Sequence, residues 1–264
     1  MKTIGFVGCG NMGGAIIRHI APQKKWNILL YDIQSDVARN LALKTASKQV
    51  ELQPLIEQSD IIVLALKPQV LVTVFEQLSA WGPKQWISMA AGVSLETLTG
   101  ALKSENVIRI MPNLAASAGF SVTAMSSAAH ADAAFIEEAL SFLQSFGEVH
   151  SIDEALFSAF TGLSGSGIAV VLEFMHAMAL GGVHEGFSYH QALEIALGTC
   201  LSAVKLQSLS AQHPQQLVSQ ICSPQGTTIE AIKHLGAANF QSTVMQAVEA
   251  ASQKAKKIEE ITSR

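Results

Sequence analysis

The glycines near the start of the chain have the spacing of a phosphate-binding turn. Gly8, Gly10 and Gly13 follow a short apolar run, and an apolar segment compatible with a helix comes directly after them. In such a strand–turn–helix unit the first glycine permits the turn, the second lets the backbone approach a pyrophosphate, and the third lets the helix pack on the strand. The N–H groups at the helix start would hold the anion. We therefore predict a dinucleotide site here; the alternative is an ordinary structural turn.

A hydroxyl-rich loop late in the chain has the chemistry to receive a carboxylate. Residues 223–228 read Ser-Pro-Gln-Gly-Thr-Thr and stand directly before a helical segment over 227–236. Thr227 and Glu230 have the spacing of a capping box, so the helix start is expected to present backbone N–H groups and a positive dipole end. A helix cap explains Thr227 but leaves the Thr228 hydroxyl to handle a proton. This loop is a candidate receptor for a small carboxylate.

Two further segments carry polar groups to places where a ligand can bind. Residues 109–113, Arg-Ile-Met-Pro-Asn, end an expected strand, and ligands of open α/β sheets bind at the carboxyl ends of strands. The alternative for Asn113 is to cap or turn the chain. Residues 164–167, Ser-Gly-Ser-Gly, open a strongly apolar helical segment, where small residues allow close approach to unpaired N–H groups. The alternative there is a plain N-cap.

Asp32 lies at the end of an expected second strand, 24 positions after Gly8, where an acid commonly accepts hydrogen bonds from the adenosine ribose. The alternative is a helix cap for the segment that starts near Ser35. The eight histidines lack metal-ligand spacing, and the sequence has neither a G-x-S-x-G nucleophile motif nor a lysine placed for a Schiff base. Hydroxyls and helix dipoles with few acid–base groups suit hydride transfer with little proton traffic, and we predict no metal.

The elements that must position these residues change in type part-way along the chain. Up to residue 151 strands alternate with helices, which is the pattern of a doubly wound, mainly parallel sheet with right-handed crossovers. Strands are expected near 4–7 and at 28–33, 60–66, 86–92, 107–113, 121–126 and 148–151, with helices at 35–46 and 131–146. Only helices are expected after residue 151, at 153–162, 167–186, 188–209, 214–221, 227–236 and 239–261. We therefore predict an α/β dinucleotide-binding domain over 1–151 and an all-α domain over 152–264.

The composition limits the classes of partner and compartment. Of 264 residues 49% are hydrophobic and only 14% are charged, with a net charge of −4. The negative charge argues against nucleic acid or an anionic membrane, and the sparse charge predicts that the helical half buries apolar surface against a second subunit. Three scattered cysteines fit a reducing cytoplasm, and we expect no signal peptide. The apolar stretch 167–183 is expected to be a buried helix, because Glu173 and His176 interrupt it.

With these segments in view, the chain resembles the pyrroline-5-carboxylate reductases. The similarity rests on GFVGCGNMG (5–13), LALKP (64–68), AAGV (90–93), IRIMPN (108–113), FTGLSGSG (160–167) and SPQGTT (223–228), in the family's order. The resemblance implies an N-terminal Rossmann domain and a helical dimerisation domain that interlocks two subunits, with dimers that often assemble into decamers. It also implies reduction of a cyclic imine acid, 1-pyrroline-5-carboxylate, to L-proline by NAD(P)H, the last step of proline synthesis.

The resemblance further implies roles for individual residues. Thr228 would be the catalytic hydroxyl donor at the imine nitrogen, and Ser223, Gly226 and Thr227 would bind substrate beside it. The loop that carries them would meet the cofactor of the neighbouring subunit. Together with the residues already discussed, the predicted cofactor-binding set is Gly8, Cys9, Gly10, Asn11, Met12, Gly13, Asp32, Ser35, Ala65, Leu66, Lys67, Pro68, Ala90, Ala91, Gly92, Asn113 and Glu154.

The chain departs from the family pattern at several positions. Ile168 follows the Ser-Gly-Ser-Gly segment where the family usually has proline, and the tyrosine two residues later is also absent. Gln225 replaces a usual glycine, so a left-handed backbone there is expected to be costly. Ser158 stands where aspartate is common. These changes concern the substrate contacts more than the reaction.

Different features of the sequence favour different cofactors. A carboxylate at Asp32 would repel the 2′-phosphate of NADP and favour NAD. Many members of the family use NADPH, and Ser35, Arg39 or Lys44 would take the phosphate if Asp32 turned away. We expect NADP, with NAD as the close alternative.

Two other functions compete with the reductase hypothesis. A β-hydroxyacid dehydrogenase shares a similar glycine-rich start and a helical second domain, but Lys205 and Lys233 lack the glycine and asparagine pattern that surrounds its catalytic lysine. A non-catalytic dinucleotide sensor would bind the nucleotide without reducing an imine.

Overall fold

The computed structural model describes residues 1–262, which fold as two compact units. The first, here the sheet unit, comprises Met1–Gly165 and the C-terminal segment from Ala251; the second, the helical unit, comprises Ser166–Ala250. The last strand ends at Ser151, where we predicted the change from strands to helices. The sheet unit nevertheless takes in helical residues on both sides of the helical unit. The assignment of 1–151 and 152–264 as separate domains stays a prediction.

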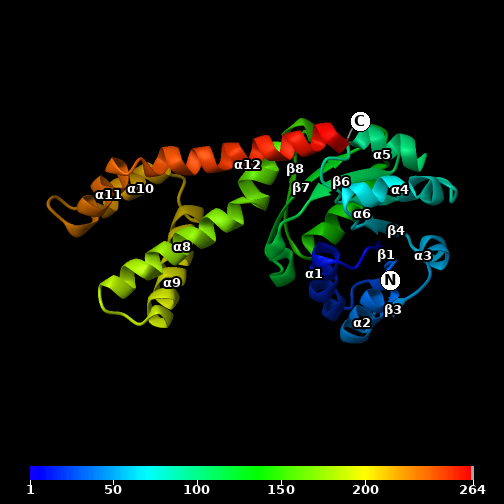
Figure 1. Cartoon of the computed structure of the whole chain (residues 1–264), viewed down its shortest axis with the longest axis horizontal. Helices are drawn as coiled ribbons and strands as arrows, with labels where there is room; N and C mark the ends of the chain where they lie inside the picture. Colours follow the sequence, from blue (N-terminus) through cyan, green and yellow to red (C-terminus); the bar gives the residue numbers. More distant parts are fainter. Residues whose placement is uncertain (263–264) are drawn as a thin grey trace. The chain divides into compact units, whose positions relative to one another are not determined.

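An eight-stranded sheet forms the centre of the sheet unit, in the order β3-β2-β1-β4-β5-β6-β7-β8 (Figure 1). All neighbouring strands are parallel except β6 and β7, which are antiparallel. The strands are β1 (Thr3–Val7), β2 (Asn27–Tyr31), β3 (Lys48–Gln49), β4 (Ile61–Leu64), β5 (Trp86–Ser88), β6 (Val107–Met111), β7 (Ser121–Ser127) and β8 (Gly147–Ser151). The mainly parallel, doubly wound sheet is confirmed. The two-residue β3 carries no apolar pattern and was not predicted.

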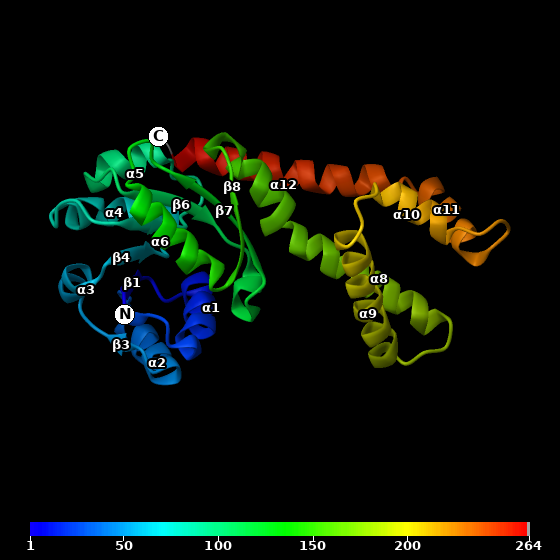
Figure 2. The same ribbon diagram turned by 180° about the vertical axis from the view of Figure 1, so that it is seen from behind.

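Helices cover both faces of this sheet (Figures 1 and 2). α1 (Asn11–Ile20), α2 (Ser35–Thr45) and α6 (Ala133–Gln144) contribute to the core on one face. α3 (Leu52–Gln58), α4 (Pro68–Ser79) and α5 (Leu95–Leu102) contribute to the core on the other. Alternate residues of β4 face the two cores and all four are fully buried, which explains the continuous apolar run in the sequence.

The described elements after β8 are all helical, as predicted. Two short 3-10 helices, η1 (Ala21–Gln23) and η2 (Leu114–Ala118), lie earlier in the chain. The later elements are a 3-10 turn η3 (Glu154–Leu156), α7 (Phe157–Phe160), a π-helical turn η4 (Thr161–Gly165), α8 (Gly167–His184), α9 (Tyr189–Ser208), α10 (Pro214–Ile221), α11 (Thr227–Ala237) and α12 (Phe240–Thr262).

The Ser-Gly-Ser-Gly segment stands at the start of α8, as expected, with Ser166 as the N-cap, but a helical turn also precedes it. Its first two residues lie in the π-helical turn η4, and Ser166 keeps right-handed helical backbone angles before α8. The chain is therefore helical on both sides of the segment.

The helical unit leaves most of its apolar side chains uncovered within one chain. Ala179, Ala192 and Ala196 are its buried hydrophobic residues among those described. Leu172, Leu201 and Val204 are each more than half exposed. The expectation that 167–183 is buried is therefore wrong for the single chain, because α8 packs mainly against one neighbour, α9, rather than inside a closed core.

Candidate nucleotide and substrate site

The loop from Gly8 to Gly13 has the geometry that a nucleotide phosphate requires. Gly8 has a left-handed φ of +103°, and a Cβ there would lie 2.5 Å from the Ala65 carbonyl oxygen. A Cβ on Gly13 would lie 2.5 Å from the Gly8 carbonyl oxygen, so α1 packs directly on the turn. No described atom lies within 4 Å of the corresponding position on Gly10. The first and third glycines are thus required for packing, whereas the second leaves the backbone open to a ligand.

The N-terminus of α1 completes this cradle. Gly10 is its N-cap, no side chain caps the helix, and the first turn carries no acidic residue. Uncapped N–H groups and the positive end of the helix dipole favour an anion. The residues present therefore fit the pyrophosphate of a pyridine dinucleotide.

Asp32 ties the end of β2 to the glycine-rich loop. Its Oδ2 accepts a hydrogen bond from the Cys9 N–H at 2.8 Å, and its Oδ1 accepts one from the Gln34 N–H at 2.9 Å. Gln34, and not Asp32, is the N-cap of α2, so the alternative of a helix cap is wrong. Ser35 begins α2 and is exposed. The predicted ribose contact of Asp32 stays a prediction.

Cys9 is held as a neutral thiol inside this loop. The residue is 5% exposed. Burial, with a smaller contribution from the Asp32 charge, raises the pKa of the Cys9 thiol to about 12. Because the thiolate is the reactive form, Cys9 belongs to the structure of the loop and has no nucleophilic role.

The other predicted cofactor residues extend along the same edge of the sheet. Residues 65–68 follow β4, the parallel neighbour of β1, and residues 90–92 follow β5, the next strand along. The Ala65 N–H donates to the Val7 carbonyl at 2.9 Å, which places residues 65–68 beside the glycine-rich loop. Lys67 is the N-cap of α4 and Pro68 its first residue, as predicted. Parallel strands end at one edge of a sheet, so these loops lie at the same edge as the glycine-rich turn, where ligands of this fold bind.

Asn113 has a structural position in the sheet unit. It is 4% exposed, its Oδ1 accepts from the Ala115 N–H at 3.2 Å, and it is the N-cap of η2. Its Nδ2 donates to the Ser164 Oγ at 3.0 Å, and that hydroxyl donates to the Val122 carbonyl at 3.3 Å. The alternative that Asn113 caps the chain is therefore confirmed, since its side chain caps η2. The two candidate segments therefore meet through Asn113 and Ser164.

Glu154 belongs to a buried ion-pair cluster that sequence reasoning missed. Its Oε1 accepts from Arg109 Nη1 at 2.6 Å and from the Leu95 N–H at 2.7 Å. Arg109 Nη2 donates to Glu259 Oε1 at 2.6 Å, and Ser158 Oγ donates to Glu259 Oε2 at 2.8 Å. An arginine in the middle of an apolar strand was the available clue, because such a charge needs partners. The role of Glu154 near a nicotinamide stays a prediction.

The predicted substrate loop lies in the helical unit, before α11. Gly226 is the N-cap of α11 and no side chain caps the helix, so the predicted capping box of Thr227 and Glu230 is wrong. Glu230 instead pairs with Lys233 at 3.2 Å. The first N–H groups of α11 are consequently left without a side-chain cap, which strengthens the case for an anion at this helix start.

Gln225 adopts the left-handed backbone conformation that we expected to be costly for a residue other than glycine. Its φ is +59°, and the turn is closed by a hydrogen bond from the Gly226 N–H to the Ser223 carbonyl at 3.0 Å. A Cβ on Gly226 would collide with the Ser223 side chain. The loop thus keeps its conformation despite glutamine, at a strain cost typical of a non-glycine residue in that region.

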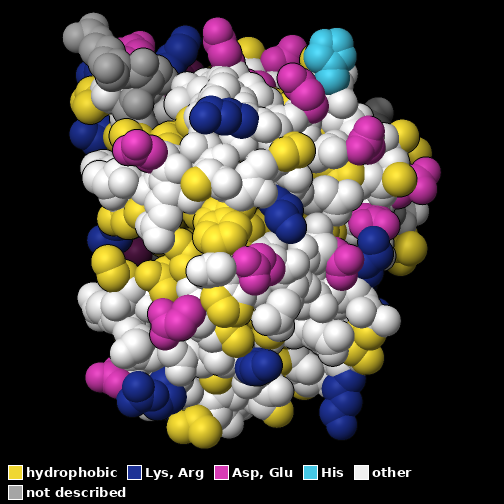
Figure 3. All heavy atoms as spheres, turned by 90° about the vertical axis from the view of Figure 1, so that its right-hand side faces the viewer, with side chains coloured by type: hydrophobic (Ala, Val, Ile, Leu, Met, Phe, Trp, Pro, Cys, Tyr) yellow, Lys and Arg dark blue, Asp and Glu magenta, His cyan; other side chains and the backbone are white. Residues whose placement is uncertain are grey.

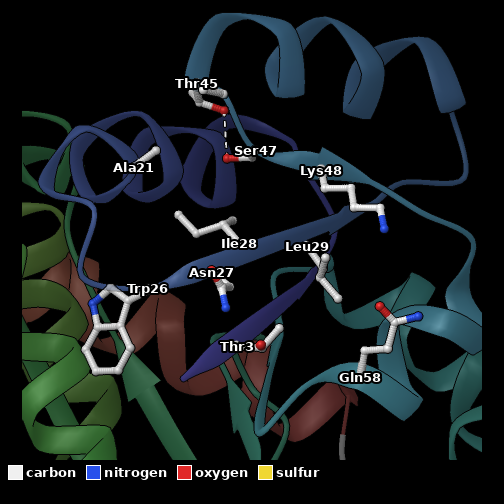
Figure 4. Close-up of a pocket in the computed structure, with 11 residues that line it drawn as sticks. Thr3, Ala21, Trp26, Asn27, Ile28, Leu29, Thr45, Ser47, Lys48 and Gln58 are labelled. Carbon is white, nitrogen blue, oxygen red and sulfur yellow. Dashed lines mark hydrogen bonds between the residues drawn. The ribbon is translucent and has the colours of Figure 1, made fainter. Parts of the chain in front are cut away.

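A cavity at the opposite edge of the sheet contains none of the predicted site residues. It is lined by residues at the starts of β1 and β2, including Thr3 and Asn27, and by Trp26, Thr45 and Ser47 (Figure 4). The Thr45 and Ser47 hydroxyls hydrogen-bond to each other at 3.0 Å. Its position at the amino ends of the strands separates it from the edge where ligands of this fold bind.

Among residues 1–262, neither metal-ligand residues nor the charges on the face shown in Figure 3 gather at a further site. On the face seen in Figure 3, Lys and Arg side chains are dispersed among Asp and Glu. Within residues 1–262 no group of three or more His, Cys, Asp and Glu could hold a metal ion. In the same range one helical stretch, Glu154–His184, is long and apolar enough to cross a membrane by length and composition alone, with 11% of its most apolar window buried.

Comparison with known proteins covers both halves of the chain. Residues 3–92 match the family model "NADP oxidoreductase coenzyme F420-dependent", and residues 154–258 match "Pyrroline-5-carboxylate reductase dimerisation". A pyrroline-5-carboxylate reductase of Aquifex aeolicus is 38% identical over 97% of both chains. A crystal structure of 1-pyrroline-5-carboxylate reductase from Streptococcus pyogenes has a TM-score of 0.87 at 33% identity, over 97% of this chain and 98% of that one. A Plasmodium falciparum pyrroline carboxylate reductase with NADP bound has a TM-score of 0.88 at 28% identity, over 98% of each chain.

The fold and the glycine-rich site define a pyridine-nucleotide-dependent oxidoreductase, built from a Rossmann sheet and an all-helical dimerisation domain. Within that class, the chain belongs to the pyrroline-5-carboxylate reductase family. The β-hydroxyacid dehydrogenase hypothesis is therefore not supported.

Proposed function

We propose that this protein reduces 1-pyrroline-5-carboxylate to L-proline as the last step of proline synthesis, with hydride from NADPH. The observation that carries the proposal is similarity over 97% of the chain to proteins named for this reaction, which includes the loop 223–228 as well as the nucleotide-binding half. When bound, the nicotinamide supplies the hydride. The protein's task is to bind, orient and protonate the imine, and orientation is the larger contribution.

The nucleotide would be held by the loops at the carboxyl edge of the sheet. The N–H groups at the start of α1 would bind the pyrophosphate, and residues 65–68 and 90–92 would flank the ribose and nicotinamide. Support comes from the open backbone at Gly10 and from the uncapped start of α1.

The substrate carboxylate would be held at the start of α11. The Thr227 N–H would donate a hydrogen bond to it, aided by the helix dipole and by the Ser223 side chain, while the Gly226 N–H donates to the Ser223 carbonyl and shapes the turn. Support comes from the missing side-chain cap at Gly226. A carboxylate held there would bring the imine nitrogen near the Thr228 hydroxyl, which is half-buried at the second position of the helix.

Thr228 would act as the hydroxyl donor at the imine nitrogen. The nitrogen must gain a proton for the imine carbon to accept hydride, and the hydroxyl would donate to the nitrogen lone pair as hydride reaches the carbon and the amine forms. The overall reaction consumes one imine, one hydride and one proton and yields one secondary amine. A positioned donor of this kind contributes roughly 10²–10⁴-fold to the rate.

The same proposal includes a preference for NADPH over NADH. Both Asp32 oxygens already accept backbone hydrogen bonds, so its charge is partly satisfied by the protein. Ser35 and Arg39 are exposed at the start of α2, where a 2′-phosphate would sit, although Arg39 also pairs with Asp36 at 3.0 Å. The competing charges predict a modest preference, with NADH used as well.

We also propose that the active protein is a cytoplasmic homodimer with interlocked helical domains, able to assemble into a decamer. The dimerisation family match over 154–258 and the exposed apolar side chains of the helical unit support it. A partner subunit would cover the apolar stretch Glu154–His184, and no nucleic acid or membrane is required as a partner. The loop 223–228 of one subunit would then meet the nucleotide of the other.

Initial rates with each nucleotide test the cofactor part of the proposal. Purified protein is mixed with 1-pyrroline-5-carboxylate and NADPH or NADH, and loss of nicotinamide absorbance is followed. We expect turnover with both and a higher kcat/KM with NADPH. A higher value with NADH contradicts the preference, and nucleotide binding without any turnover indicates a sensor.

A further inference from the structure

One buried charge of the sheet unit has no part in the proposed reaction. Arg109 lies in β6 among apolar neighbours and is 2% exposed. An unpaired guanidinium in such a position would be strongly unfavourable, so its partners determine what the buried charge does.

Arg109 is held from two sides by carboxylates. Nη1 contacts Glu154 and Nη2 contacts Glu259, each at 2.6 Å, and the Phe157 ring centre lies 4.6 Å from Cζ. Glu154 starts η3, whereas Glu259 comes from the end of α12, 150 residues away from Arg109. The cluster therefore fastens two distant helical segments to the central sheet.

Both carboxylate residues also touch the segment that follows β5. The Leu95 N–H at the start of α5 donates to Glu154 Oε1 at 2.7 Å. Gly92 has a φ of +77°, and a Cβ on it would lie 3.0 Å from the Glu259 Cα. At the base of the same segment, Ser88 of β5 is paired with Arg109 in the sheet and its Oγ accepts from the Ala90 N–H at 3.3 Å. The segment 88–95, which contains the loop 90–92, is thus paired with Arg109 in the sheet at Ser88, lies close to Glu259 at Gly92 and is bound to Glu154 at Leu95.

We propose that the cluster of Arg109, Glu154 and Glu259 holds the loop 90–92 in its nucleotide-binding conformation, which makes Arg109 and Glu259 positioning residues for hydride transfer. The part about hydride transfer rests on the proposed function, because that function places this loop beside the nicotinamide. The mechanical part does not, because it concerns the order of the loop in the protein without any ligand.

Ser158 offers a matched rescue. Its Oγ donates to Glu259 Oε2 at 2.8 Å, so the side chain at 158 lies one hydrogen bond away from the carboxylate that pairs with Arg109. An aspartate at position 158 can supply a negative charge to Arg109 when Glu259 is neutral. Glu138→Gln is the matched control, since it breaks a surface ion pair with Lys2 that lies outside the cluster.

The test compares three variants with the wild type. They are the single variant Glu259→Gln, the double variant that combines Ser158→Asp with Glu259→Gln, and the control Glu138→Gln. Amide hydrogen exchange over residues 88–95 reports loop order without any ligand. The dissociation constant of NADPH and kcat with the imine report positioning, and the thermal midpoint reports folding. We expect Glu259→Gln to raise exchange in 88–95, to weaken NADPH binding by roughly tenfold and to lower kcat, with little change in KM for the imine. The Ser158→Asp double variant should recover most of these losses, and Glu138→Gln should show none.

Unchanged exchange over 88–95 in Glu259→Gln overturns the proposal. A lower thermal midpoint with NADPH affinity and kcat within twofold of wild type also overturns it, because the cluster would then be structural only. If Glu259→Gln does not fold, Arg109→Lys, which keeps the charge but loses the two-sided fork, is measured in the same way. Increased exchange with no turnover even in the wild type supports loop positioning and contradicts the proposed function instead.

Discussion

At the scale of single residues, the Thr228 hydroxyl carries the proton chemistry of the proposed reaction. It lies at the second position of α11, beside a helix start that no side chain caps. Because the Thr228 hydroxyl does not cap the helix, its loss is expected to affect the reaction rate more than the stability of the fold.

We predict that Thr228→Ala lowers kcat by roughly 10²–10⁴-fold, since a positioned general acid contributes about that much. The dissociation constant of NADPH should stay near the wild-type value. Thr228→Ser keeps the hydroxyl and should retain most of kcat. Steady-state kinetics and nucleotide titration measure both. Full kcat in Thr228→Ala would mean that water delivers the proton.

Cys9 makes a pH-dependent contribution to stability. Its thiol has a folded-state pKa of about 12, against 9.0 for a free thiol, so the folded protein holds the proton where the unfolded chain loses it. The contribution is therefore fully present below pH 9 and is lost as the pH rises from about 9 to 12. We predict that the free energy of unfolding falls more steeply above pH 9 in the wild type than in Cys9→Ala. Urea unfolding at pH 7.5 and pH 10 measures the difference, and parallel losses in the two proteins would contradict a buried neutral thiol.

At the scale of elements, the strand–turn–helix unit of β1 and α1 separates packing from ligand binding. The Gly13 backbone touches the turn, whereas the Gly10 backbone faces open space. Substitution by alanine should therefore affect stability at Gly13 and ligand binding at Gly10.

We predict that Gly13→Ala costs roughly 1–3 kcal/mol in the free energy of unfolding, because a Cβ there would lie 2.5 Å from the Gly8 carbonyl oxygen. Gly10→Ala should leave stability nearly unchanged and weaken NADPH binding, since its methyl group would point to the pyrophosphate position. Gly100→Ala, in α5 with no described atom within 4 Å of the added carbon, is the neutral control for both measurements. Equal loss of stability in Gly10→Ala and Gly13→Ala would contradict this division.

The sequence predicts elements well where one physical rule dominates. The run 60–66 had to be a doubly buried strand, and the glycine spacing at 8–13 had to close a turn. Prediction from the sequence failed where two physical rules compete. Thr227 and Glu230 have capping-box spacing, yet Gly226 is the cap, and the glycine-rich segment 164–167 continues a helix through a π-helical turn.

Contacts between distant segments lay beyond prediction from sequence. Arg109 in an apolar strand showed that a buried charge needs partners, but nothing local identified Glu259, which lies 150 positions away. Asn113 illustrates the same limit: its position at a strand end suggested a ligand, whereas the folded chain uses its amide to hold Ser164.

At the scale of the whole molecule, the exposed apolar surface of the helical unit requires a partner. Side chains such as Leu172 and Leu201 are 57% and 60% exposed in one chain. Apolar surface on that scale is commonly covered in stable proteins, and the match to a dimerisation family supports the proposal that a second copy covers it.

We predict that the wild type sediments as a dimer or a multiple of dimers, and that Leu172→Asp shifts it toward monomer with a parallel loss of activity. Leu43→Asp, on the exposed face of α2 in the sheet unit, is the control for the oligomeric state. Analytical ultracentrifugation gives the masses. A monomeric wild type with full activity would contradict both the dimer and the sharing of the loop 223–228 between subunits.

The most direct test of the account is transfer of hydride to the imine carbon. The protein is incubated with 1-pyrroline-5-carboxylate and NADPH that carries deuterium at the transferable nicotinamide position, and the products are analysed by mass spectrometry. The account predicts L-proline enriched by one deuterium, formed at the rate at which nicotinamide absorbance is lost. Bound nucleotide with no proline, or proline without the label, would contradict it.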